Sequence, residues 1–285
     1  MDPVAAVERL WPDRGANVVP LSGGITNHNF KVEVNGQAFV LRMGGAETGL
    51  LGIDREVEHQ ASLRAAEVGL GPPVIAFFPG DGWLVTRFID GRPIPLEEMR
   101  RPQTIQRVAA ALSKLHGAAP IPGRFDAHAV VEEYWREAEA HGVEVPPAYA
   151  AAHATSEQIR RTRGAQATVP CHNDLLNANF LDDGEIRIVD WEYAGMGDRF
   201  FDLANLSVNH EFGPAEDEIL LADYFGESTA VRVESLAMMK FMSDFREAMW
   251  GVLQSGISEL DFDFDGYAAK HFQRLAAHAG ALRIE

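Results

Sequence analysis

Cysteine is almost absent from this sequence, since Cys171 is the only one among 285 residues. A single thiol excludes the disulfide framework that supports many small secreted domains. The first residues lack the basic start and apolar stretch of a secretory signal. No apolar run reaches the roughly 20 residues that a membrane-spanning helix needs. These absences lead us to expect a cytoplasmic protein with no membrane segment.

Basic residues are also scarce. Lys and Arg number 25 against 42 Asp and Glu, which gives a formal net charge of -17. Proteins that bind nucleic acid need clustered basic residues, so we expect no nucleic-acid partner. An acidic chain is compatible with a cationic small-molecule substrate, although most acidic residues only keep a protein soluble.

The first 90 residues have the pattern of a small β-rich lobe with one long helix. Asn35-Gly36 stands between two apolar runs and is the strongest short hairpin signal in the chain. Helical periodicity follows the hairpin and stops at Gly69. The elements that we expect are helices at 3–10 and 54–68 and strands at 31–34, 38–43, 72–78 and 82–88.

The remaining residues, 91–285, read as a larger and mainly helical lobe. The expected elements are helices at 104–117, 129–141 and 148–163, a β island at 169–189, and further helices from about residue 201. A β-rich lobe at 1–90 followed by a helical lobe at 91–285 predicts an α+β fold with two lobes.

The strongest chemical signal is a polar loop in the β island. Asp174 and Asn179 lie on this loop, and a short hairpin then returns the chain to Asp190. Two carboxylates and an amide would thus converge where Mg²⁺ and the phosphates of a nucleotide can bind. Phosphoryl transfer needs one Asp to orient the attacking hydroxyl group and oxygen ligands to hold the metal. The spacing therefore predicts an ATP- and Mg²⁺-dependent phosphotransferase.

Two weaker features belong to the same hypothesis. Gly23 and Gly24 would let backbone N–H groups approach phosphates, but the same pair also suits a simple tight turn. Arg42 would pair with ATP oxygens and with a carboxylate of the following helix, Glu58 first and Glu56 second. His172, inside the polar loop, is expected to hold the loop's shape by hydrogen bonding.

Taken together, these motifs resemble the choline/ethanolamine kinase family of the aminoglycoside-phosphotransferase-like superfamily. The resemblance covers nearly the whole chain and is most specific in residues 190–195 and 201–205. It implies a two-lobed, protein-kinase-like fold with ATP in the cleft. It also implies that Asp174 is the catalytic base, that Asn179 and Asp190 hold Mg²⁺, and that Asp202 braces the catalytic loop.

The resemblance extends to the nucleotide site and to the acceptor, a small amino alcohol. The implied ATP-binding residues are Gly23, Gly24, Thr26, Asn27, Arg42, Glu58 and Phe88, the last in the linker near adenine. The implied substrate-binding residues are Asp174, Glu211, Trp250 and Tyr267. Aromatic faces can hold a quaternary ammonium group, each contact contributing up to about 2 kcal/mol.

The chain departs from the family pattern at one position of this pocket. The eukaryotic enzymes carry a Trp three positions before the one that matches Trp250, whereas this chain has Glu247. An acidic residue there favours an acceptor with N–H donors, such as ethanolamine. Choline is the leading acceptor, with ethanolamine, thiamine or an aminoglycoside-like amine as alternatives. Two further alternatives are a nucleotide-binding pseudokinase and aromatic residues that only pack in the core.

Overall fold

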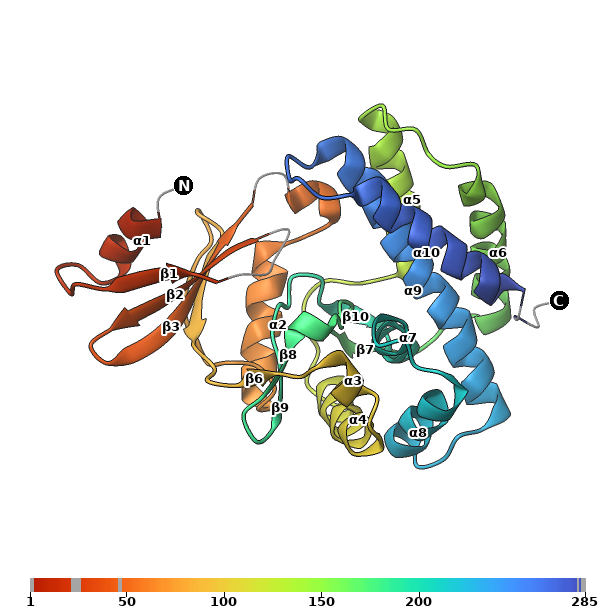
Figure 1. The fold of residues 1–285 in the computed structure, drawn as a ribbon, viewed down its shortest axis with the longest axis horizontal. Helices are drawn as coiled ribbons and strands as arrows, with labels where there is room; N and C mark the ends of the chain where they lie inside the picture. The colour runs from red at the N-terminus through yellow and green to blue at the C-terminus, as the bar shows by residue number, and fades with distance from the viewer. Residues whose placement is uncertain (1–2, 22–26, 46–47, 281, 283–285) are drawn as a thin grey trace.

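The computed structural model describes residues 3–21, 27–45, 48–280 and 282 (Figure 1). The N-terminal lobe is built on a five-stranded antiparallel sheet with the strand order β1-β2-β3-β5-β4. Its elements are α1 (Pro3–Leu10), β1 (Asn17–Pro20), β2 (Asn27–Val34), β3 (Gln37–Gly44), η1 (Thr48–Leu51), α2 (Arg55–Glu67), β4 (Val74–Phe78) and β5 (Trp83–Arg87).

The β2–β3 hairpin turns at Asn35-Gly36, as the sequence predicts. Both residues have positive φ, 53° and 71°, which is the backbone that a tight hairpin turn requires. The resulting register places Phe39 and Leu41 on the buried face, where they join Val7 of α1 in a small core. The hairpin thereby fixes which side chains of β3, Arg42 among them, remain available to the opposite face.

Helix α2 begins and ends where its sequence signals lie. The Asp54 side chain caps it by accepting hydrogen bonds from Glu56 N and Val57 N at 2.9 and 3.2 Å. Gly69 follows the helix with φ of 74°, a conformation that costs glycine little. The helix buries Glu58, so this carboxylate lies inside the lobe rather than in solvent.

The C-terminal lobe is mainly helical, with two small antiparallel sheets. Its elements are β6 (Arg92–Pro93), α3 (Leu96–Met99), α4 (Pro102–His116), α5 (Ala127–Ala140), α6 (Ala148–Arg163), β7 (Thr168–Cys171), η2 (Asn177–Asn179), β8 (Phe180–Asp182), β9 (Ile186–Ile188), β10 (Gly195–Asp198), α7 (Arg199–Asn209), α8 (Pro214–Phe225), α9 (Ala230–Ile257) and α10 (Phe264–Ala279). The small sheets have the orders β6-β8-β9 and β10-β7.

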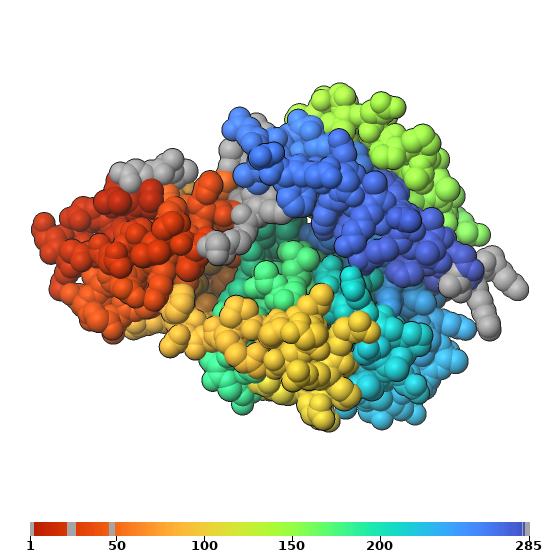
Figure 2. Space-filling model, viewed as in Figure 1, coloured from red at the N-terminus to blue at the C-terminus, as the bar shows by residue number. Residues whose placement is uncertain are grey.

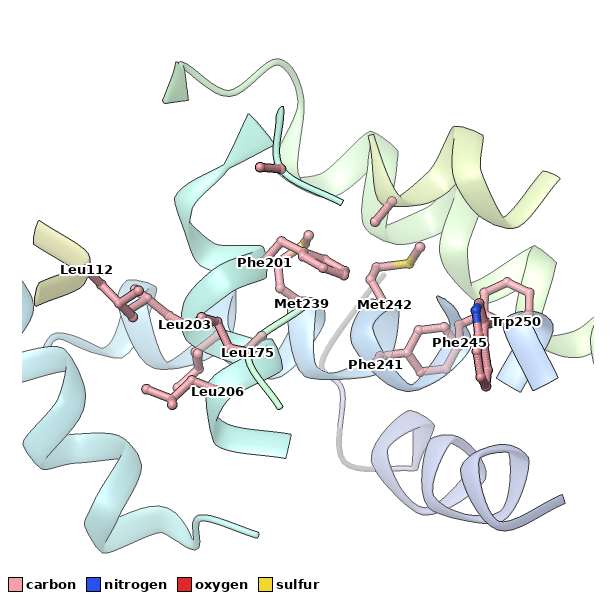
Figure 3. Close-up of a cluster of buried hydrophobic side chains, with 14 of the residues drawn as sticks. Leu112, Leu175, Phe201, Leu203, Leu206, Met239, Phe241, Met242, Phe245 and Trp250 are labelled. Atoms are coloured by element: carbon pink, nitrogen blue, oxygen red, sulfur yellow. The ribbon is translucent and has the colours of Figure 1, made fainter. Parts of the chain in front are cut away.

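The core of this lobe surrounds α9, a helix of 28 residues that packs against α5, α7 and α10. Figure 3 shows Phe241 and Phe245 of α9 together with Phe201 and Leu203 of α7 in this core. Leu175 of the catalytic loop joins the same cluster. The loop is therefore anchored in the hydrophobic core of the C-terminal lobe.

The predicted α+β fold with a small sheet-containing lobe and a larger helical lobe is confirmed. The predicted division at Asp90-Gly91 falls between β5, the last strand of the five-stranded sheet along the chain, and β6, which pairs with β8. Strand β10 was not expected, because Gly195–Asp198 has no alternating apolar pattern and forms a strand only by pairing with β7. Among the helices of the described residues, none combines the length and apolarity that a membrane crossing requires.

Candidate active site

A cleft of about 600 Å³ lies between the two lobes. Figure 2 shows the surface hollowed between them. Several residues predicted from sequence line this cleft, namely Arg42, Phe88, Asp174, Asn179, Asp190, Trp250 and Tyr267. The predicted residues Gly23, Gly24 and Thr26 lie outside the described residues.

The catalytic loop, residues 172–179, is held by two side chains of α7. Asp202 accepts hydrogen bonds from the backbone N–H groups of His172 and Asn173 at 2.8 and 2.7 Å. Asn205 accepts one from Leu175 N at 2.6 Å. All these groups are fully buried, where an unpaired N–H would cost about 1–3 kcal/mol. Helix α7 therefore fixes the backbone on both sides of Asp174.

The His172 ring supports the same loop from the opposite side. Its Nδ1 accepts a hydrogen bond from Asp174 N at 3.2 Å, and its Nε2 donates to Val189 O at 3.0 Å. Burial lowers the pKa of His172, which keeps the ring neutral in this arrangement. The ring thus connects the catalytic loop to the residue that precedes Asp190.

Asn179 and Asp190 are positioned as the sequence predicts for ligands of a hard cation. The Asn179 side-chain N–H donates to Asp174 O at 2.8 Å, which leaves its amide oxygen as the free polar atom. Its backbone oxygen accepts from Val189 N at 3.0 Å, so Asp190 follows directly. Asp190 has φ of 70°, an uncommon conformation for a residue other than glycine. An amide oxygen and a carboxylate on one cleft wall form a donor set that fits Mg²⁺.

Arg42 joins α2 to this metal end of the cleft. One guanidinium nitrogen pairs with Glu58, as predicted, and Nη2 lies 2.8 Å from Asp190 Oδ1. Burial alone would lower the pKa of Arg42, but the surrounding carboxylates, Asp190 first, outweigh burial and raise it. The guanidinium is therefore a permanent positive charge beside the predicted phosphate site.

The structure assigns Asn27 a different contact from the predicted one with nucleotide. Its side-chain N–H donates to Glu192 Oε2 at 2.7 Å, and both residues are buried. Arg55 Nη1 lies 3.5 Å from the same Glu192 oxygen. Asn27 is not among the residues that line the cleft, whereas its partner Glu192 is. Glu192 thus connects the two lobes, a role that the sequence analysis missed.

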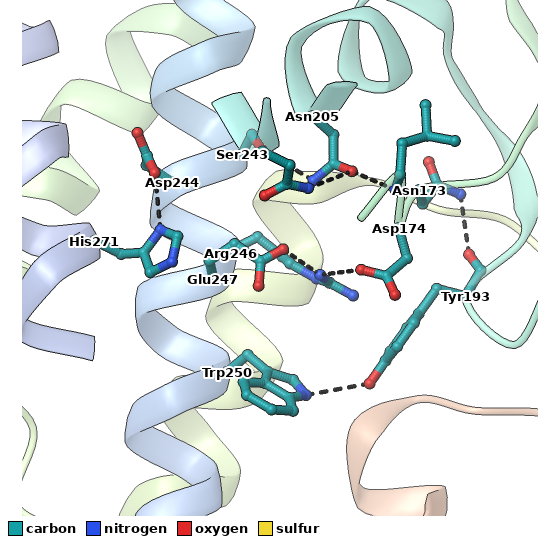
Figure 4. A network of polar contacts seen from close by, with 12 residues as sticks. Asn173, Asp174, Tyr193, Asn205, Ser243, Asp244, Arg246, Glu247, Trp250 and His271 are labelled. Atoms are coloured by element: carbon teal, nitrogen blue, oxygen red, sulfur yellow. Dashed lines mark hydrogen bonds and ion pairs between the residues drawn. The ribbon is translucent and has the colours of Figure 1, made fainter. Parts of the chain in front are cut away.

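The other end of the cleft combines aromatic rings with an ion pair (Figure 4). Trp250 and Tyr267 meet edge to face with ring centroids 5.5 Å apart. Trp250 Nε1 donates to the Tyr193 hydroxyl at 3.2 Å, and the Tyr267 hydroxyl donates to Glu247 Oε2 at 2.7 Å. Trp250 also belongs to the hydrophobic core, so it both packs and lines the cleft.

Asp174 lies where the metal end and the aromatic end meet. Burial raises the pKa of Asp174 to about 8, although Arg246 acts in the opposite direction. Arg246 Nη1 is 3.3 Å from Asp174 Oδ1, and the same nitrogen pairs with Glu247. A carboxyl with a pKa near neutrality can accept a proton from a bound hydroxyl group.

One predicted substrate-binding residue is not part of this site. Glu211 is exposed, has φ of 54°, and does not line the cleft. The prediction is corrected because α7 ends at Asn209, with His210 as its cap, and the next residue turns outward. The acidic side chain beside Tyr267 at the aromatic end of the cleft is Glu247.

The sequence analysis also missed Arg246 and Tyr193. A usable signal was present, since Asp244, Arg246 and Glu247 are charged residues within an otherwise apolar stretch of α9. Charged side chains on a buried helix face need partners, and such partners often lie in a functional cleft.

The fold, the catalytic loop and the cleft define a small-molecule phosphotransferase with two kinase-like lobes. The family model described as "Phosphotransferase enzyme family" matches residues 17–234. The chain belongs to this family and, within it, to the choline/ethanolamine kinases. It is a kinase with an alcohol group as acceptor.

Three relatives illustrate the similarity. A solved choline/ethanolamine kinase family protein from Mesorhizobium loti superimposes with a TM-score of 0.82 at 31% identity, covering 99% of this chain and 98% of the other. A probable ethanolamine kinase of Arabidopsis thaliana is 26% identical over 88% of this chain and 76% of its own length. The human choline/ethanolamine kinase is 24% identical over 97% and 83%.

Proposed function

We propose that this protein transfers the γ-phosphoryl group of ATP to the hydroxyl group of a small amino alcohol, with choline as the leading acceptor. The observation that carries the proposal is the position of Asp174 in the cleft. The predicted metal ligands Asn179 and Asp190 lie on one side of it, and Trp250 and Tyr267 lie on the other.

In the proposed reaction Asp174 orients the acceptor hydroxyl and takes its proton. The hydroxyl oxygen forms a bond to the γ-phosphorus while the bond from that phosphorus to the bridging oxygen breaks, and ADP leaves with the electron pair. Arg42, a fixed positive charge beside Asp190, would face the phosphates. Mg²⁺ bound by Asn179 and Asp190 would neutralise phosphate charge.

The hydrogen bonds that Glu247 already accepts favour choline over an amine with N–H donors. Both of its oxygens already accept from side chains of the protein, Oε1 from Arg246 and Oε2 from Tyr267. The charge of this carboxylate is therefore already offset by Arg246, and each of its oxygens already holds one donor. The aromatic faces of Trp250 and Tyr267 suit a methylated ammonium group, which cannot donate a hydrogen bond.

Ethanolamine is the second candidate. The Arabidopsis thaliana relative is named a probable ethanolamine kinase, and the human relative a choline/ethanolamine kinase. A pseudokinase is disfavoured, because Asp174, Asn179 and Asp190 are all present and all line the cleft.

The proposal is tested by measuring ADP release from Mg-ATP with choline, ethanolamine, thiamine and kanamycin. Asp174→Ala and the nearly isosteric Asp174→Asn serve as controls. We expect choline-dependent turnover that both variants abolish. If only another acceptor is phosphorylated, that acceptor replaces choline as the proposed substrate, and the proposed mechanism is unchanged. Full activity of Asp174→Asn would contradict the mechanism itself.

A further inference from the structure

Arg246 occupies the centre of the acceptor end of the cleft. It projects from α9 and is 1% exposed, although it carries a full positive charge. Its guanidinium carbon lies 4.4 Å from the centre of the Tyr193 ring. The same group pairs with Glu247 and lies 3.3 Å from Asp174 (Figure 4).

These contacts are the ones that a bound ammonium group would make. A cation is recognised by the face of an aromatic ring and by nearby carboxylates. Arg246 already uses the Tyr193 ring and the Glu247 carboxylate for this purpose. The protein therefore supplies one cation of its own to the pocket that would receive the cationic acceptor.

The position of Arg246 is costly for the fold. Its Nε and Nη2 atoms are enclosed and find no hydrogen-bond acceptor among the described residues. A buried guanidinium with incomplete partners is poor evidence for stability, since apolar residues of similar volume often replace such groups without loss. A contribution to ligand recognition accounts better for a charged residue at this place than a purely structural one.

The net charge of the pocket around Arg246 follows from three ionisable side chains. Asp174 and Glu247 each contribute one negative charge when ionised, and Arg246 offsets one of them. In the form that can act as a base, with Asp174 ionised, one negative charge remains, which matches an acceptor with one ammonium group. Without Arg246 the same pocket would hold two uncompensated carboxylates and would match an acceptor with two.

We propose that Arg246 is a specificity-determining residue that restricts this enzyme to amino alcohols with a single cationic group. The inference rests on the proposed function, because it assumes that the acceptor binds beside Asp174. Polycationic amines are excluded because the site nearest Tyr193 and Glu247 already holds a positive charge. The acceptor's own ammonium group is left with Trp250 and Tyr267.

The test compares one acceptor of each kind in the same enzyme preparation. Ethanolamine carries one ammonium group, and a diaminopropanol with an amine on each side of its hydroxyl carries two. The measured quantity is the ratio of kcat/KM for the diaminopropanol to that for ethanolamine. This ratio does not depend on the fraction of folded enzyme, so a variant that folds poorly still reports specificity.

Four variants separate the effect of the pocket's net charge from the effects of its individual side chains. Arg246→Met removes the resident cation, and we expect the ratio to rise by at least roughly tenfold, the effect of a unit charge about 10 Å away at an effective dielectric constant of about 20. Glu247→Gln removes a carboxylate and should lower the ratio. The double variant restores the original balance and should return the ratio to near the wild-type value. Arg246→Lys keeps the charge but loses the planar group that lies over Tyr193, so its ratio should stay closer to the wild-type value than that of Arg246→Met.

An unchanged ratio in Arg246→Met, or a double variant that behaves like Arg246→Met alone, would overturn the inference. Calorimetric binding of the same two amines to the four variants and the wild type gives a second ratio that needs no turnover. If no acceptor is phosphorylated, the proposed function fails while the binding ratio still tests Arg246. If ethanolamine is phosphorylated and neither ratio changes, only the inference about Arg246 fails.

Discussion

Asn27 at the start of β2 donates a buried hydrogen bond of 2.7 Å to Glu192, a residue 165 positions further along the chain. This contact joins the first residue of β2 to the segment that follows Asp190. The two lobes are thus linked at a residue two positions after Asp190, a predicted metal ligand. A substitution that breaks this bond should affect both stability and the placement of nucleotide.

Asn27→Ala tests this link. It removes the side-chain donor that lies 2.7 Å from the buried Glu192 carboxylate, so we expect the free energy of unfolding to fall by about 1–3 kcal/mol. Urea denaturation followed by tryptophan fluorescence measures this change. Asn17→Ala is the matched control, because Asn17 donates to Glu33 at the surface and should change stability by less than about 0.5 kcal/mol. Equal effects of the two substitutions would contradict the assigned role of Asn27.

Asp202→Ala tests the support of the catalytic loop. The substitution removes the acceptor of two buried backbone N–H groups and of the His116 ring. We expect kcat to fall about 100-fold, because a shift of the loop by about 1 Å moves the catalytic carboxylate. Asp202→Asn retains one oxygen and should lose less. A folded Asp202→Ala enzyme with normal kcat would show that α7 does not position the loop.

Trp250→Ala tests the aromatic end of the cleft. Loss of one desolvated cation–π contact should raise the KM for choline about tenfold. Trp250→Phe keeps a ring at the same place and should raise it less. Steady-state kinetics with choline measures both effects, and circular dichroism checks that the fold is intact. A KM for choline that is the same in the Ala and Phe variants would remove Trp250 from the proposed cation site.

The stability of the protein should depend on pH through His210. This ring is fully buried between Phe180 and Phe212, and burial lowers the pKa of His210 to about 4 from 6.5. Below pH 6.5 the unfolded chain gains a proton that the folded protein does not bind. Stability is therefore lost between pH 6.5 and 4, by up to about 3 kcal/mol from this group alone.

His210→Gln should remove this part of the pH dependence. Denaturation midpoints measured between pH 4 and 8 should show a shallower decline in the variant than in the wild type. Its stability at pH 8, where the histidine is neutral in both states, reports the packing cost of the substitution separately. If the stability of both proteins declines equally between pH 8 and 4, His210 does not cause this part of the pH dependence.

The sequence could predict much of the nucleotide and metal end of this site. Asp174, Asn179 and Asp190 lie close together along the chain, and a short hairpin is enough to assemble them. The pairing of Arg42 with Glu58 could also be anticipated, because a strand and the next helix pack side by side. Local geometry and short connections determine these placements.

The acceptor end could not be predicted in the same way. Arg246 meets Asp174 across 72 residues, and its orientation depends on how α9 packs against α5, α7 and α10. Glu211 was misplaced for a related reason, since a single residue beyond a helix end decides whether it points to the cleft or to solvent. Contacts of this kind arise from tertiary packing and leave no pattern in the neighbouring sequence.

The buried position of Cys171 allows its chemical labelling to report local opening of the C-terminal lobe. The thiol is completely enclosed at the end of β7, directly before the catalytic loop, and burial raises its pKa well above the ordinary value. Alkylating reagents react with the thiolate, so the folded protein should resist them. Because the chain contains no other cysteine, its labelling rate measures how often this part of the C-terminal lobe exposes its interior. Slower labelling in the presence of a bound nucleotide or amine would give the stabilisation due to that ligand without any assay of turnover.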